Sequence, residues 1–201
     1  MLNDEIDLFK EQRKLLSDFI SELAIVDEGN LEPKHSFLAE AVIFRLFRIY
    51  ERLVKSAFLY YCVNDTSLAG HPVVSKLRCS AIEDAEEILK AGNKFLDWGN
   101  VVSTQKLAGL VFDAGYPITD ILSPLHSHLV DLQRFRNFIA HDSREAMEGF
   151  QRARGSYIKV GDIPPETVGL LGLYRRSPSS DISLRILFEK VARLAEVVQG
   201  V

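Results

Sequence analysis

Three residues that could handle a phosphate group lie close together near the end of one apolar segment. Arg136 is followed directly by Asn137, and His141 comes five positions after the arginine. A guanidinium binds phosphate through two parallel hydrogen bonds, and an imidazole gains or loses a proton near neutral pH. These side chains therefore predict a phosphate-handling site.

The segment that carries this site is expected to be a helix. Leucine and isoleucine recur at helical spacing at Leu125, Leu129, Leu132 and Ile139, and Arg136 lies on the same stripe. A buried guanidinium without a partner is costly, so Arg136 needs a partner, a ligand or an opening to solvent.

The spacing of Arg136 and His141 also limits how both side chains can reach one ligand. Residues five apart on an ideal helix point about 140° apart. For both to meet one phosphate, the helix must end or bend near His141, or the site must draw on two subunits. Residues 142–145 resemble a capping box, which predicts a break at that point and a new helix up to Arg154.

The rest of the chain also predicts helices, and the fold class is all-α. We expect a bundle of about five to seven helices in a single domain, 1–201, with a short irregular or β-like segment near 157–180. The N-terminal helix is expected over 4–26 with a stop at Glu28 and Gly29, and Gly92 should end another helix. The core bundle covers 36–154, and a loop and closing helix cover 155–199. Residues 157–160 could form a short strand.

The second helix, expected from Ser36 to about Cys62, is apolar over most of its surface. Such a helix lies centrally in a bundle or in a dimer interface. Arg48 and Arg52 share one side of it, with Glu51 beside them. One interpretation is a solvated or salt-bridged face, and the other is that these three residues line a cleft beside Arg136 and His141.

The segment from Arg136 to His141 resembles the Arg-x(4–6)-His signature of the HEPN superfamily, the helical domains found in many metal-independent ribonucleases. The asparagine after the arginine, the Ile-Ala-His-Asp ending and a helix begun by Ser123-Pro124 add to this likeness, and Arg134 matches the same signature at its longest spacing. The region from Trp98-Gly99-Asn100 to Leu122 also looks like prokaryotic members. The resemblance covers roughly residues 36–146.

This resemblance and the chemistry of RNA together imply a metal-independent endoribonuclease acting on single-stranded RNA. The 2′-hydroxyl attacks the phosphate and leaves a 2′,3′-cyclic phosphate, with His141 as general base or acid, Arg136 stabilising the developing charge and Asn137 orienting the histidine or the phosphate. The resemblance further implies a homodimer, no cofactor, and a role as a toxin or phage-defence effector with an antitoxin or neighbouring defence protein as partner. Residues expected to bind substrate are Arg48, Glu51, Arg52, Arg134 and Arg144.

Composition limits the other possibilities. The net charge of −4 counts against a strongly electrostatic nucleic-acid binder, but not against a ribonuclease with a few arginines in a cleft. There is no long apolar run and no signal-peptide pattern, so we expect a cytoplasmic protein without a membrane span. His126 and His128 point apart on a helix, so no metal site is expected.

The alternative function is a non-catalytic HEPN-like module that binds a partner protein or a nucleotide.

Overall fold

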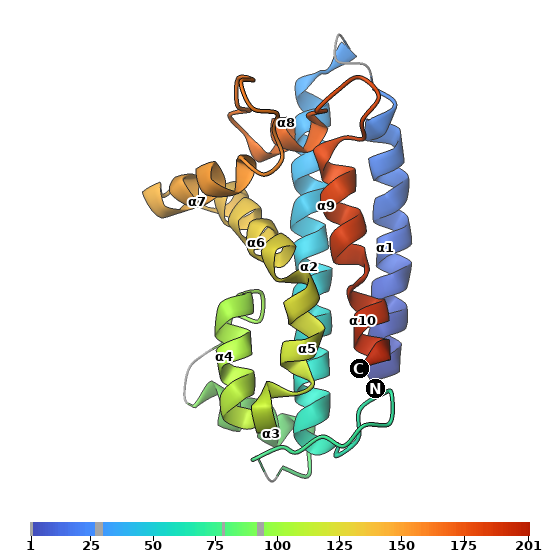
Figure 1. Ribbon diagram of the computed structural model, residues 1–201, viewed down its shortest axis with the longest axis vertical. Coiled ribbons are helices and arrows are strands. Elements are labelled where there is room, and N and C mark those ends of the chain that lie inside the picture. The colour runs from blue at the N-terminus through green and yellow to red at the C-terminus, as the bar shows by residue number, and fades with distance from the viewer. Residues whose placement is uncertain (1, 27–29, 78, 92–94) are drawn as a thin grey trace. The chain divides into compact units, whose positions relative to one another are not determined.

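The apolar stretches form helices because their hydrophobic residues recur every three or four positions. In the computed structural model, the described residues are 2–26, 30–77, 79–91 and 95–201. These ranges contain helices and isolated β-bridges but no β-strand, which confirms the all-α class (Figure 1). The helix ends expected at Glu28, Gly29 and Gly92 lie outside the described residues.

Some connections between the helices are 3-10 turns, and longer loops precede the helices that begin at Ile82, Val168 and Ser183. None of the described helices is both long enough and apolar enough to cross a membrane. Their bounds are α1 (Leu2–Ala24), α2 (Pro33–Val63), α3 (Ile82–Lys90), α4 (Val101–Val111), η2 (Asp113–Gly115), α5 (Ile118–Leu122), η3 (Ser123–Leu125), α6 (His126–Ala140), α7 (Arg144–Arg154), α8 (Val168–Leu173), α9 (Ser183–Ala192) and α10 (Leu194–Gly200).

Contacts between the helices divide the chain into two compact units, and each unit draws on separate parts of the sequence. Unit 1 consists of the chain up to Lys10, Ile49–His126 and Arg193–Val201. Unit 2 consists of Glu11–Arg48 and Ser127–Ala192. Helices α1 and α2 therefore contribute residues to both units.

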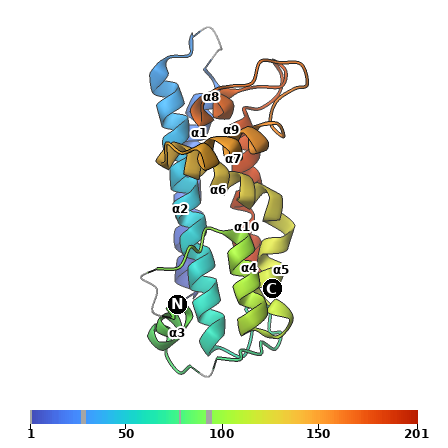
Figure 2. The same ribbon diagram turned by 90° about the vertical axis from the view of Figure 1, so that its left-hand side faces the viewer.

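Unit 1 is built around an aromatic cluster on the C-terminal half of α2. The ring of Phe58 lies 5.1 Å from Trp98 and 5.1 Å from Phe112, measured between ring centroids. Trp98 is only 5% exposed, which agrees with a role in packing. Helices α4 and α5 lie side by side in this unit (Figure 2), and the Lys55 ammonium pairs with the Glu86 carboxylate of α3 at 2.9 Å.

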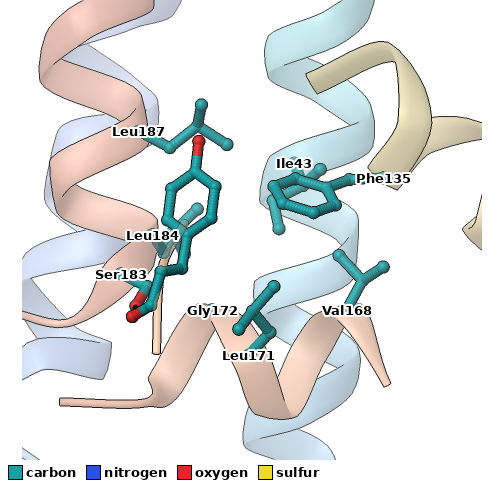
Figure 3. Close-up of a pocket in the computed structure, with 9 residues that line it drawn as sticks. Ile43, Phe135, Val168, Leu171, Gly172, Ser183, Leu184 and Leu187 are labelled. Atoms are coloured by element: carbon teal, nitrogen blue, oxygen red, sulfur yellow. Dashed lines mark hydrogen bonds between the residues drawn. The ribbon is translucent and has the colours of Figure 1, made fainter. Parts of the chain in front are cut away.

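Unit 2 is built around the N-terminal half of α2, with α8 and α9 packed against it. Gly169 of α8 lets the backbones of α8 and α2 approach closely, since a Cβ there would clash with the Ser36 carbonyl, and Gly172 packs on the side chains of Ala39 on α2 and Leu184 on α9. Figure 3 shows Phe135 of α6 directed toward Ile43 in this core. The cavity between these side chains is about 10 Å³, which is barely the size of one water molecule, so it is no ligand site.

Two local expectations are corrected by the structure. Residues 157–160 form a turn rather than a strand, because the Asp162 amide donates to the Lys159 carbonyl at 3.2 Å and Gly161 has a φ of 97°. The Tyr157 ring is buried against Phe135, with centroids 5.4 Å apart, instead of alternating with a neighbouring strand. The closing helix is also divided in two, since α9 ends at Ala192 and α10 begins at Leu194.

Candidate active site

The motif helix α6 ends where the spacing of Arg136 and His141 requires. Its last residue is Ala140, and residues 141–143 have no regular structure. The side chain of Ser143 then accepts a hydrogen bond from the Ala146 amide at 3.2 Å and so begins α7. A serine in this position stabilises a helix start by roughly 1 kcal/mol. The predicted break near His141 is therefore confirmed.

Arg136 is half-buried and is held on two sides. Its guanidinium carbon lies 4.7 Å from the centre of the Phe47 ring on α2, a cation–π contact. Its Nη1 donates to the side-chain oxygen of Asn137 at 2.9 Å. The demand that Arg136 find a partner is thus met in part, by an aromatic face and by an amide oxygen.

The opposite edge of this guanidinium has no protein partner within the described part of the chain. Nε is buried and makes no hydrogen bond, and Nη2 donates to no described residue. An unsatisfied buried donor costs roughly 1–3 kcal/mol. The Nε–Nη2 edge is one of the two that a guanidinium uses to bind a phosphate or carboxylate through paired hydrogen bonds.

His141 lies immediately beyond the end of α6 and is exposed. Its backbone amide donates to the Asn137 carbonyl at 2.9 Å, which continues the helical pattern by one bond. Among the described residues, its ring forms no hydrogen bond with Arg136 or Asn137. The structure therefore joins Arg136 to Asn137 directly and leaves the imidazole open to solvent.

A groove lies beside this helix end, on the N-terminal half of α2. It measures about 550 Å³, and Ile139 of α6 closes it on one side. Two phenylalanine rings are open to solvent there, with Phe37 70% and Phe44 37% exposed. We refer to this feature as the α2 groove, lined by Phe37, Glu40, Ala41, Phe44, Arg45, Arg48 and Ile139.

Of the five residues expected to bind substrate, Arg48 is the one that lines the α2 groove. Arg134 pairs with the Asp131 carboxylate at 3.2 Å, and Arg144 pairs with Glu148 across one turn of α7 while 87% of its side chain stays exposed. Both therefore form pairs on their own helices.

The other two residues belong to unit 1. Arg52 forms two hydrogen bonds with the Glu5 carboxylate, at 2.6 and 2.8 Å, which corresponds to the salt-bridged interpretation of this side of the helix. Glu51 is half-buried on α2.

One buried carboxyl group lies on α6 within unit 2. Asp131 is 8% exposed, and this burial raises its pKa above the ordinary value, while the positive charge of Arg134 opposes the rise. On the same helix, burial and the charge of Lys190 lower the pKa of His128. Both shifts favour the neutral form, which is what an apolar setting imposes on ionisable groups.

A metal ion would need several ligands grouped around the histidines. His126 faces a protein partner, since its Nδ1 lies 3.0 Å from the side-chain oxygen of Gln105. Across the described ranges, no three side chains of His, Cys, Asp or Glu are grouped so that they could hold an ion.

Sequence reasoning missed the aromatic residues of this region. Phe47 was counted only as part of an apolar helix, and Phe37 and Phe44 were not singled out. One signal was present, because Phe37, Phe44 and Arg48 follow at intervals of seven and four residues and so fall on one line along a helix. Because α2 is apolar on most sides, its sequence does not show which line of residues is exposed and which lines are buried. The packing of α6 against α2 decides this.

Comparison of the chain with protein-family models, curated proteins and solved structures finds no match. The functional argument therefore rests on the chemistry of the residues at the end of α6 and along α2.

Proposed function

We propose that this protein is a metal-independent endoribonuclease of the HEPN type that cleaves single-stranded RNA at the end of α6. The observation that carries the proposal is the guanidinium of Arg136. It is oriented by Phe47 and Asn137, and its Nε–Nη2 edge has no partner among the described residues. Because Nε is buried in this conformation, the proposal includes a turn of the guanidinium toward solvent when RNA binds, so that the phosphate supplies the missing acceptors.

The chemistry assigned to the site follows from RNA itself. The 2′-oxygen attacks phosphorus, the bond from phosphorus to the 5′-oxygen breaks, and a 2′,3′-cyclic phosphate and a 5′-hydroxyl result. One proton leaves the 2′-hydroxyl and one reaches the departing 5′-oxygen, so the reaction needs a base and an acid. His141 fills one of these roles in each copy of the chain, and a homodimer provides both.

Arg136 acts on the charge that develops during this reaction. The five-coordinate phosphorus carries extra negative charge on its non-bridging oxygens, and paired donors at fixed positions stabilise it. Asn137 positions the guanidinium through its oxygen, while its amide nitrogen, which donates to no described residue, can contact the phosphate. Of the two roles that the sequence suggested for Asn137, orienting His141 or orienting the phosphate, this contact corresponds to the second.

The same contacts are also compatible with a second candidate, a non-catalytic module that binds a partner protein or a nucleotide elsewhere on its surface. Phe47 and Asn137 give Arg136 enough support for a purely structural role. In that case the protein holds Arg136 for packing, and His141 only marks the end of the helix.

Cleavage of labelled single-stranded RNA in excess EDTA separates the two candidates. Arg136→Ala and His141→Ala should each reduce the rate by at least about 100-fold, because general acid–base catalysis and oxyanion stabilisation each contribute factors of this order. Arg152→Ala and His71→Ala are the matched controls, since both residues are exposed and lie outside the site. The products should carry a cyclic phosphate, detected by mass spectrometry.

Two results would contradict the nuclease proposal. If the parent protein leaves RNA intact at every concentration tested, or if the Arg136 and His141 variants cleave as fast as the controls, the enzyme is excluded. Melting curves for all variants show whether lost activity reflects lost folding.

A further inference from the structure

The α2 groove combines side chains that rarely remain exposed together. Phe37, Phe44 and Arg48 are exposed although they lie on one of the most apolar helices of the chain. Exposed apolar patches on a folded protein usually mark a binding surface. The groove therefore needs an occupant that covers aromatic rings and also carries charge.

The spacing along α2 defines the shape of that occupant. Phe37, Phe44 and Arg48 lie on one line, with a rise of roughly 10 Å between the two rings and roughly 6 Å from Phe44 to Arg48. The arrangement is a line of two flat apolar faces followed by positive charge at one end. It suits an extended chain that carries flat groups together with negative charges.

The charge of the groove supports the same occupant. Arg45 and Arg48 face Glu40 in the lining, so the groove has an excess of positive charge in a molecule of net charge −4. The Glu40 carboxylate accepts a hydrogen bond from the Gly169 amide at 3.1 Å, and the Arg45 guanidinium donates from Nε and Nη2 to the Gln12 side-chain oxygen. Local fields of this kind attract an anion to an acidic protein.

The groove also adjoins the candidate active site. Ile139, which closes it, lies three residues after Arg136 on α6 and two before His141. Phe47, under the Arg136 guanidinium, directly precedes Arg48 on α2. A strand lying along α2 therefore leads to the end of α6.

We propose that the α2 groove binds the unpaired bases of a single RNA strand, with Phe37 and Phe44 stacking on bases and Arg48 contacting the backbone phosphate. Stacking on aromatic side chains is how proteins hold single strands without reading their sequence. The inference deepens the proposed function, on which it rests for its choice of ligand. It adds two binding residues that lie outside the Arg136–His141 motif.

The test measures binding apart from cleavage. In a His141→Ala background, which prevents turnover, fluorescence anisotropy follows a labelled oligouridine of about eight nucleotides. Phe37→Leu and Phe44→Leu keep an apolar side chain but remove the stacking face. Each should weaken binding about fivefold or more, the loss expected for one stacked base. Phe37→Trp should restore affinity, and Phe95→Leu, at an exposed ring in unit 1, should leave it unchanged.

A second ligand separates stacking from charge. An oligonucleotide with abasic positions keeps every phosphate and loses every base, so its weaker binding should not respond to Phe37→Leu. If Phe37→Leu and Phe44→Leu bind oligouridine as tightly as the parent, or weaken the abasic strand equally, base stacking in the groove is excluded.

Other outcomes distinguish this proposal from the nuclease. Cleavage by the parent with no effect of the phenylalanine variants on binding overturns the groove proposal and leaves the nuclease intact. Binding that depends on Phe37 and Phe44 without any cleavage supports the groove and overturns the nuclease. If the leucine variants instead turn a dimer into a monomer in sedimentation while anisotropy is unchanged, the groove is an interface between copies and the proposal is wrong.

Discussion

Replacing Arg136 by methionine should remove its charge at little cost to the stability of the fold. The contacts of the guanidinium determine how much it contributes to the free energy of unfolding. Its cation–π contact with Phe47 contributes about 1 kcal/mol, and its hydrogen bond to Asn137 contributes about 1.5 kcal/mol. The buried Nε without a partner costs about 2 kcal/mol. The net contribution of the charged group is therefore small.

Methionine suits the space that remains. Its sulfur makes favourable contacts with aromatic rings, of roughly 0.3–1.5 kcal/mol, and it buries no donor. We expect Arg136→Met to change the free energy of unfolding by less than about 1 kcal/mol. Arg136→Ala should cost more, because it uncovers the Phe47 ring, which is fully buried in the protein.

Urea denaturation followed by circular dichroism measures these differences, since the midpoint shifts in proportion to the free energy. Arg152→Met is the control, because an exposed arginine outside any packed contact should change stability by less than about 0.5 kcal/mol. A loss of more than about 3 kcal/mol in Arg136→Met would show that the guanidinium is essential to packing. The reasoning that assigns it to a ligand would then fail.

Three further predictions concern the fold and its response to pH. Ser143→Ala should lower stability by about 1 kcal/mol in thermal or urea melts, because it removes the cap of α7, and an unchanged midpoint would contradict that role. The raised pKa of Asp131 means that the native protein holds its proton at higher pH than the unfolded chain does, so this group lowers stability as pH rises above 3.8. Asp131→Asn should accordingly gain stability relative to the parent between pH 4 and pH 7 in urea titrations; a difference independent of pH would count against the buried acid. Gly169→Ala should cost more than about 2 kcal/mol, because a Cβ would lie 2.3 Å from the Ser36 carbonyl oxygen, whereas Gly109→Ala on the open side of α4 should be neutral or stabilising in the same melts.

The sequence was informative wherever a local signal decides the structure. Helical periodicity identified α2 and α6, and the spacing of Arg136 and His141 together with Ser143 located the end of α6 to within a residue or two. The turn at residues 157–160 was missed because its pattern of alternating residues also suits a strand. What decides between the two is Tyr157, whose ring packs on Phe135 of another helix, a contact between residues far apart in sequence.

The candidate site was less predictable for the same reason. The contact of Arg136 with Asn137 was not predicted, because adjacent residues on a helix do not normally face each other. Phe47 reaches the guanidinium from a helix about ninety residues earlier, which sequence spacing cannot show. The surroundings of an arginine on α2 depend on what packs opposite it. Arg52 meets Glu5 of α1, while Arg48 lines the α2 groove together with Ile139 of α6. Helical spacing alone treats these two arginines as equivalent.

The interleaved order of the two units has a consequence for biosynthesis. Unit 1 requires Arg193–Val201 in addition to residues near the start of α1, and unit 2 requires residues up to Ala192. Unit 1 can therefore be completed on the ribosome only after residues 193–201 have been made, and unit 2 only after α9 has been made. While such a chain is being made, it depends on chaperones or on rapid collapse once the missing segments emerge. A premature stop before α9 would leave both units incomplete, instead of one complete unit and one incomplete unit.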